Sequence, residues 1–255
     1  MAVPKLLAVL VSTSAWDMPS AEQIDGGMPL IHALRPLMDR WCDSWRLAVE
    51  ANILRDWKTI PAQCGKYVGN YMMMGGHYRS DSRAAVIDKA IAYAEGLKLS
   101  GNGNEVWVFD VDETMLSNLP YYANHRFGAE PYNWTAFSAY VKAASAPALP
   151  ETMRLYKRLQ ALGIKPVILT GRREGKMEPT EKNLARAGYT GYLKLLHKPQ
   201  DANVRSVEFK SGERKKLEGA GYVIVGNIGD QWSDIQGTPQ GARTFKLPNP
   251  MYYVG

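Results

Sequence analysis

The strongest constraint in this sequence is a series of short apolar runs that each lead into acidic or hydroxyl-bearing residues. The run at 106–109 is followed by Asp110, and the run at 166–169 is followed by Thr170. A third run, at 222–225, leads through a glycine-containing stretch to Asp230. Short, continuous apolar runs are typical of strands that are buried on both faces. The pattern therefore predicts a sheet with polar side chains where its strands end.

Helical segments separate these strands. We expect helices at 149–162, 179–187 and 211–220, and weaker strands at 192–196 and 244–247. Strands that alternate with helices predict an α/β fold with a doubly wound parallel sheet. Right-handed crossovers bring the carboxyl ends of such strands to one edge, where ligands bind.

The chain before residue 100 predicts helices and no convincing strand. The segments with apolar residues at helical spacing are 37–57, 64–74 and 82–97. We expect residues 16–100 to form a helical region that packs on a core at 101–255, effectively as one domain. The stretch between residues 115 and 150 is too short for a large cap domain, so we expect a small flap and an open site of broad specificity.

The first fifteen residues resemble a short signal peptide. Lys5 supplies a positive charge, residues 6–11 are apolar, and residues 13–15 are small. Elsewhere no run approaches the roughly 20 apolar residues that a membrane span requires. We therefore expect a signal peptide at 1–15 and no membrane partner for the mature chain.

The chain has two cysteines, Cys42 and Cys64, which fit either two buried thiols or one disulfide. The signal-like start and an N-x-T glycosylation sequon at Asn133 favour export, and disulfides persist outside the cytosol. We therefore expect one disulfide between two helices, which would stabilise the fold by about 3 kcal/mol.

The formal net charge is +6, from 31 basic and 25 acidic residues. A basic balance fits anionic substrates, nucleic acid or an acidic surface. The basic residues are scattered, and the densest cluster, at 214–216, predicts a solvated helix face. We therefore expect no nucleic-acid partner.

The residues after the strands predict a metal site. Several carboxylates at one edge of a sheet repel one another unless a cation lies among them, and oxygen ligands favour Mg²⁺. The candidate carboxylates are Asp110, Asp112, Asp230 and Asp234. No His or Cys lies near these motifs at the spacing that zinc requires.

The same residues predict phosphoryl transfer. Asp110 can attack phosphorus to give an aspartyl phosphate, which water then hydrolyses. Asp112, two residues further on, can act as general acid and then as general base. Thr170 and Lys210 can hold phosphoryl oxygens, and we place Lys210 just before a helix that Ser211 caps.

Side chains around these motifs have more than one interpretation. Arg172 fits a substrate contact or a surface ion pair equally well. Tyr121, Tyr122 and Trp134 lie where a lid would shape the substrate pocket, although core or surface packing is the simpler expectation for each.

The motifs resemble the four motifs of the haloacid-dehalogenase superfamily. They are residues 110–114 (Asp-Val-Asp-Glu-Thr), residues 168–172 (Ile-Leu-Thr-Gly-Arg), Lys210, and residues 229–234. The segments that closely resemble the plant class B acid phosphatases and vegetative storage proteins are 42–64, 207–211, 225–234 and 245–253. The likeness spans residues 35–255.

This resemblance implies a role for each candidate residue. Asp110 is the implied nucleophile and Asp112 the implied acid and base. The implied holders of substrate and phosphate are Thr170, Gly171, Arg172 and Lys210. The implied Mg²⁺ ligands are Asp110, the backbone carbonyl of Asp112, Asp230 and Asp234. The family further implies secretion or vacuolar delivery, glycosylation, small phosphorylated substrates and, often, a homodimer.

Two functions remain open at this point. One is an acid phosphatase that hydrolyses phosphate monoesters. The alternative is a vegetative storage protein with weak or vestigial phosphatase activity. Some storage proteins in this group have Ser in place of the nucleophilic aspartate, so Asp110 favours the enzyme.

Overall fold

The computed structural model of the protein describes residues 28–73 and 77–255, so the predicted signal peptide at 1–15 lies outside the described residues. The chain divides after Arg40, and the unit Trp41–Gly255 contains the sheet and every residue predicted for the site. The predicted boundary at residue 100 lies inside this unit. Among the described residues, no helix is long and apolar enough to cross a membrane.

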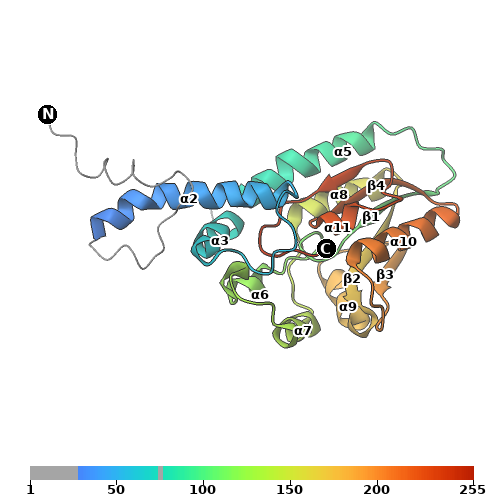
Figure 1. Ribbon diagram of the computed structural model, residues 1–255. Helices are drawn as coiled ribbons and strands as arrows, with labels where there is room; N and C mark the ends of the chain where they lie inside the picture. The colour runs from blue at the N-terminus through green and yellow to red at the C-terminus, as the bar shows by residue number, and fades with distance from the viewer. Residues whose placement is uncertain (1–27, 74–76) are drawn as a thin grey trace. The chain divides into compact units, whose positions relative to one another are not determined.

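One five-stranded sheet forms the centre of the unit Trp41–Gly255 (Figure 1). Its strands are β1 (Glu105–Phe109), β2 (Lys165–Arg173), β3 (Lys194–Lys198), β4 (Val223–Gly229) and β5 (Thr244–Lys246). The strand order is β3-β2-β1-β4-β5, and every neighbouring pair is parallel. The predicted doubly wound parallel sheet is therefore confirmed, with β1 at its middle.

The described helices both precede the sheet and connect its strands. The α-helices are α2 (Met28–Glu50), α3 (Gly65–Met73), α4 (His77–Ser80), α5 (Asp88–Glu95), α6 (Leu119–Ala123), α7 (Trp134–Ala143), α8 (Pro150–Ala161), α9 (Met177–Arg186), α10 (Ser206–Gly219) and α11 (Trp232–Ile235). The other helical segments are three 3₁₀ helices, at Ala62–Cys64, Arg126–Gly128 and Glu174–Lys176, and one π-helix at Asp81–Ile87.

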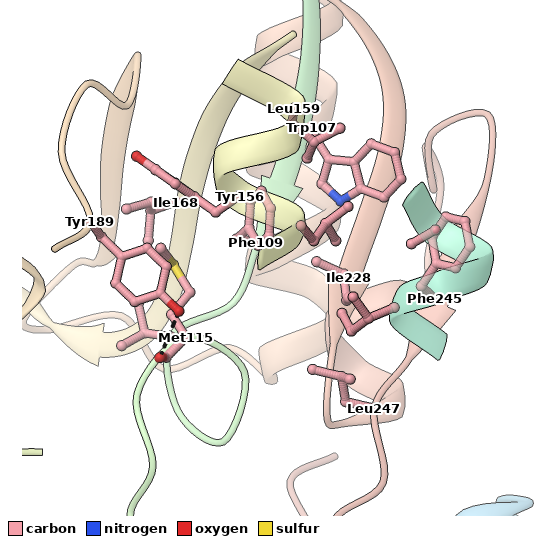
Figure 2. Packing of buried hydrophobic residues seen from close by; sticks show 14 of the residues in the cluster. Trp107, Phe109, Met115, Tyr156, Leu159, Ile168, Tyr189, Ile228, Phe245 and Leu247 are labelled. Atoms are coloured by element: carbon pink, nitrogen blue, oxygen red, sulfur yellow. Dashed lines mark hydrogen bonds between the residues drawn. The ribbon is translucent and has the colours of Figure 1, made fainter. Parts of the chain in front are cut away.

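Side chains of β1 alternate between two cores, as the period of two along a strand requires. Trp107 and Phe109 lie in the larger core, with residues of α5 and α8 (Figure 2). Val106 and Val108 lie in a smaller core with residues of α10. The Trp107 ring also lies against β4, where a Cβ at Gly226 would be only 2.3 Å from the indole. Packing on both faces fixes the end of β1, from which the site residues extend.

A third core joins the helices that precede the sheet to the segment after β1. It contains Trp45 of α2, Val68 of α3, Tyr121 and Tyr122 of α6, and Phe137 of α7. The expected packing of the two tyrosines is therefore confirmed. The predicted disulfide between Cys42 and Cys64 is also confirmed, and it ties α2 to the turn before α3.

Three helix expectations are wrong. The helix predicted at 37–57 ends at Glu50, because Asn52 adopts a left-handed conformation with φ of 59°. The helix predicted at 211–220 begins at Ser206, so Lys210 lies inside α10 and not before it. Ser211 is no cap, since its hydroxyl donates to the Val207 carbonyl at 2.7 Å within the helix.

Candidate active site

The predicted site residues come together at the carboxyl edge of the sheet. Asp110 directly follows β1, and its N–H donates to the Ile228 carbonyl of β4 at 3.1 Å. Asp230 directly follows β4, and Asp234 lies in the short helix α11. Lys210 reaches this edge from α10. The parallel topology thus brings Asp110 together with residues that lie 100 or more positions further along the chain.

Three buried carboxylates and one ammonium group form the centre of the site. One oxygen from each of Asp110, Asp230 and Asp234 lies within 4.8 Å of the others. The Lys210 Nζ donates to Oδ1 of Asp110 at 2.5 Å and to Oδ1 of Asp234 at 2.6 Å. With all three carboxylates ionised, the charges of the carboxylates and of the Lys210 ammonium group together would sum to about −2 in a buried region.

The two aspartates after β4 are held by different partners. Oδ2 of Asp230 accepts hydrogen bonds from Gln231 at 2.8 Å and Asn249 at 2.7 Å. Oδ2 of Asp234 accepts from the Gln231 N–H at 2.8 Å. Both oxygens of Asp234 therefore have protein donors, and Gly229 makes room for its side chain, because a Cβ there would lie 2.3 Å away. Both oxygens of Asp230 have donors as well, because its Oδ1 accepts from the Thr114 hydroxyl at 3.3 Å. Among the described residues, the carboxylate oxygen of this cluster without a hydrogen-bond donor is Oδ2 of Asp110.

Burial and mutual repulsion raise the pKa values of two carboxyl groups in this cluster. Burial raises the pKa of Asp110 well above its usual range, Lys210 opposes this rise, and the other aspartates add to it. Burial and the charge of Asp234 raise the pKa of Asp230 to about 6. A hard dication among these oxygens would offset the charge that burial disfavours, so the donor set fits Mg²⁺.

Asp112 is held by a buried arginine. Nη2 of Arg172 lies 2.8 Å from Oδ1 of Asp112, and Nε lies 3.1 Å from Oδ2. The Asn118 amide also donates to Oδ1, at 2.8 Å. Burial acts to raise the pKa of Asp112, but Arg172 and Asn118 together lower it below its usual value. Arg172 is therefore neither a surface ion pair nor a free group, since its side chain is only 2% exposed.

The end of β2 provides the other predicted phosphate contacts. Thr170 is fully buried, and its Oγ1 accepts from the Arg172 N–H at 3.1 Å, which leaves the hydroxyl proton free for another acceptor. Gly171 is exposed, and a Cβ there would meet nothing within 4 Å. The backbone at Gly171 is thus open to a ligand.

Glu113 has a role that the sequence did not reveal. Its side chain is fully buried, and one oxygen accepts from the Asn118 N–H and from the Ser117 hydroxyl. The other oxygen has no partner among the described residues. Burial, with the charge of Asp230, raises the pKa of Glu113 to about 8. Glu113 therefore shapes the turn that carries Asn118 to Asp112.

Arg214 is the second residue that sequence analysis missed, because the basic cluster at 214–216 predicted a solvated face. Arg214 is fully buried. Its guanidinium donates to the carbonyls of Pro239 at 2.6 Å, Asp234 at 2.6 Å and Gln236. Lys210 and Arg214 are four residues apart on α10, so one helix face holds both the carboxylate and the backbone of Asp234.

A cleft of about 1010 Å³ opens beside Asp112. Gly171, Arg172 and Asn118 line its inner part, and side chains of α7 and of the turn Glu174–Lys176 line its outer part. Trp134 is 63% exposed and lines this cleft, which excludes core packing for it but not surface packing. The structure thus places Asp112 at a cavity large enough for a small organic substrate.

Asn133 directly precedes Trp134 in the chain. Its side chain is exposed, and its Oδ1 caps α7 by accepting from the Ala136 N–H at 3.0 Å. The cap uses only the oxygen, so the amide nitrogen that a glycan would occupy has no hydrogen bond to the described residues. Glycosylation at Asn133 stays a prediction.

The fold and the order of its motifs define a class of protein. A parallel sheet with aspartates after its central strand and after β4, and a lysine from the intervening helix, is the arrangement of the haloacid-dehalogenase superfamily. Residues 31–255 match the family model described as "HAD superfamily, subfamily IIIB (Acid phosphatase)". The chain belongs to this family.

Curated relatives and solved structures agree with this assignment. The chain is 44% identical to "Acid phosphatase 1" of Solanum lycopersicum over 84% of its length and 83% of that protein. It is 39% identical to "Vegetative storage protein 2" of Arabidopsis thaliana over 98% of its length and 97% of that protein. The class C acid phosphatase from Bacillus anthracis has a similar fold, with a TM-score of 0.58, 21% identity, and coverage of 74% of this chain and 85% of that one.

Proposed function

We propose that the protein is an acid phosphatase that hydrolyses phosphate monoesters of small molecules through an aspartyl phosphate on Asp110, with Mg²⁺ as cofactor. The observation that carries this proposal is the pairing of Lys210 with two of the three clustered carboxylates, at the end of the central strand. Membership of an acid phosphatase family supports the reaction class.

In the first step, an oxygen of Asp110 attacks phosphorus, and the bond from phosphorus to the leaving-group oxygen breaks. Asp112 donates a proton to that oxygen as general acid. Arg172 and Asn118 lower the pKa of Asp112 in the free protein, so it takes up this proton when the negative charge of a bound phosphate raises that pKa. Lys210, the Thr170 hydroxyl and the backbone near Gly171 hold the phosphoryl oxygens. Because Oδ1 of Asp110 accepts from Lys210, its Oδ2 is the oxygen available for attack.

In the second step, the Asp112 carboxylate accepts a proton from a water molecule whose oxygen attacks phosphorus. The bond between phosphorus and Asp110 breaks, inorganic phosphate leaves, and both aspartates return to their starting states. Arg172 and Asn118 keep the Asp112 carboxyl group in one place through both steps.

Asp110, Asp230 and the backbone carbonyl of Asp112 would hold the metal, with Asp234 behind them as the partner of Lys210. When bound, Mg²⁺ supplies positive charge that offsets the carboxylates and the phosphoryl oxygens.

The test is hydrolysis of 4-nitrophenyl phosphate by the purified protein, with Mg²⁺ and with a chelator. We expect Mg²⁺-dependent turnover that Asp110→Asn reduces by at least about 1000-fold, because an amide is a poor nucleophile. Asp56→Asn is a matched control, since Asp56 lines the outer cleft without contacting the cluster. Turnover that survives in Asp110→Asn would reject the assigned nucleophile.

A storage role is the second candidate, and the similarity to "Vegetative storage protein 2" over 98% of the chain favours it. In that case the fold serves as a nitrogen reserve and the site is vestigial. Negligible specific activity, with abundance in leaf or pod tissue that follows nitrogen supply, would support storage over catalysis.

We also propose delivery through the secretory pathway, to the vacuole or the cell exterior. The Cys42–Cys64 disulfide and the exposed sequon at Asn133 support this, because disulfides and N-glycans belong to that pathway. We further propose that the protein forms a homodimer and that it binds no nucleic acid. Sedimentation of the purified protein and a DNA-binding titration at low salt would test these two points.

A further inference from the structure

The outer cleft combines exposed aromatic rings with cations. Among the described side chains, Tyr132 and Trp134 are the Phe, Tyr and Trp residues with the most exposed surface, at 53% and 63%, and both line this cleft. The Lys176 Nζ lies 5.3 Å from the ring centroids of both Trp134 and Phe137. A large exposed ring gains nothing from burial in the folded chain, so two of them beside a reaction centre point to a ligand.

The cations of the outer cleft outnumber its acids. The lysines and arginines that line the cleft are Lys58, Lys142, Arg172, Arg173, Lys176 and Arg205, and the acids are Asp56 and Asp112. Arg172 is neutralised by Asp112, and Arg205 pairs with Glu208 outside the cleft. Within the described part of the chain, Lys142 and Lys176 have no carboxylate at ion-pair distance.

Lys176 is a cleft cation without an ion pair among the described residues that the charge of Asp112 still reaches. It is half-buried, and burial lowers its pKa, an effect that Asp112 opposes and that Arg172 and Lys142 reinforce. Its ammonium group therefore lies within the electrostatic reach of Asp112, the group that protonates the leaving oxygen, and of two other cations. An anion bound here would relieve the repulsion among them.

We propose that Tyr132, Trp134 and Lys176 form a leaving-group subsite that selects phosphate monoesters whose leaving group is an aromatic ring with a second negative charge. The ring would lie against Tyr132 and Trp134, and its anionic substituent would pair with Lys176. This inference rests on the proposed function, since it describes what the same site prefers. It replaces the broad specificity that the short flap segment predicts.

The test uses two matched pairs of substrates. The first pair is 4-(carboxymethyl)phenyl phosphate and 4-(carbamoylmethyl)phenyl phosphate, which differ in charge but hardly in shape or in the acidity of the leaving phenol. The second pair is an open-chain alkyl phosphate with a terminal carboxylate and its amide. The quantity compared is kcat/KM, in the presence of Mg²⁺.

We expect the charged aryl ester to exceed its amide by about tenfold in kcat/KM, and Lys176→Gln to bring the ratio of the two kcat/KM values, both measured in that variant, to about one. Trp134→Ala should lower kcat/KM for both aryl esters about fivefold and leave both alkyl esters unchanged. Lys182→Gln, an exposed lysine of α9 outside the cleft, is the matched control and should change nothing.

Equal kcat/KM for the charged and neutral aryl esters, or a preference that persists in Lys176→Gln, would overturn the subsite. Such a result would leave the proposed function intact, since all four esters would still be hydrolysed. If the protein hydrolyses none of the four esters, the proposed function fails, and the subsite fails with it.

Discussion

The acidic centre and the outer cleft differ in how their charges are satisfied. In the centre, Lys210 bonds two carboxylates and Arg172 bonds Asp112, all with side chains that are largely or wholly buried. In the outer cleft, Lys142 and Lys176 have no ion-pair partner among the described residues, and Trp134 is mostly exposed. Buried charges need partners within the folded chain, whereas charges in a cleft can stay solvated until a ligand binds.

This contrast separates two kinds of residue. Residues of the centre should affect both stability and turnover when they are changed, because their partners are left buried without compensation. Residues of the outer cleft should affect only the substrates that contact them. The following changes test that division.

Lys210→Met should give the largest loss. The substitution keeps the length of the side chain but leaves Asp110 and Asp234 without the ammonium group that pairs with both. We expect kcat/KM for an aryl phosphate to fall at least about 100-fold, because the pKa of Asp110 rises further and the nucleophile takes up a proton. Lys216→Met, at an exposed position of the same helix, should retain full activity, and similar activity in both variants would break the comparison.

Arg214→Met should mainly lower stability. It removes the donor to three carbonyls, of Asp234, Gln236 and Pro239, in a region that excludes water. Each unsatisfied carbonyl costs about 1 kcal/mol or more, so we expect the free energy of unfolding to fall by about 3 kcal/mol. Urea denaturation measures this, with Lys215→Met as the neighbouring exposed control. An unchanged midpoint would show that the guanidinium does not hold the segment after α11.

Glu113→Gln should change how stability depends on pH. The pKa of Glu113 is about 8 in the folded protein, against an ordinary value of 4.5. At a pH between these two values, Glu113 is therefore protonated in the folded protein and ionised in the unfolded chain. The unfolding free energy of the metal-free protein should therefore fall as pH rises from 5 to 8. We expect the glutamine variant to reduce that fall by an amount on the order of 3 kcal/mol. If the unfolding free energy depends on pH in the same way in the unchanged protein and in Glu113→Gln, the raised pKa of the buried Glu113 is contradicted.

Trp134→Ala and Lys176→Gln should have the smallest effect on folding. Trp134 is largely exposed and Lys176 has no ion pair among the described residues, so each change should shift the unfolding free energy by less than about 0.5 kcal/mol. Thermal denaturation checks this directly. A loss of 2 kcal/mol or more would mean that these side chains support the fold and are not reserved for a ligand.

Much of the centre could be predicted from the sequence, because short apolar strands fix the positions of the residues that follow them. Asp110 and Asp230 needed only the parallel topology to be brought together. The strand at 166–169 proved longer, since β2 continues through Thr170 to Arg173. The added residues are what direct Arg172 inward, toward Asp112.

The residues that the sequence did not reveal depend on burial of polar groups. Arg214 stands beside two exposed lysines and has no apolar pattern to mark it as internal. Ser211 follows Lys210 and has the residue type of a helix cap, yet α10 starts five residues earlier. Tertiary contacts determine the burial of Arg214 and the starting point of α10, and local propensity does not predict either of them.

The most direct test of the account is the location of the phosphoryl group during turnover. Asp112→Asn removes the base of the second step, and 4-nitrophenyl phosphate needs little help from an acid in the first. After mixing with Mg²⁺ and quenching in acid, mass spectrometry should find the phosphoryl group on the peptide that contains Asp110. A phosphoryl group on any other residue, or release of nitrophenol without a phosphorylated peptide, would contradict the account.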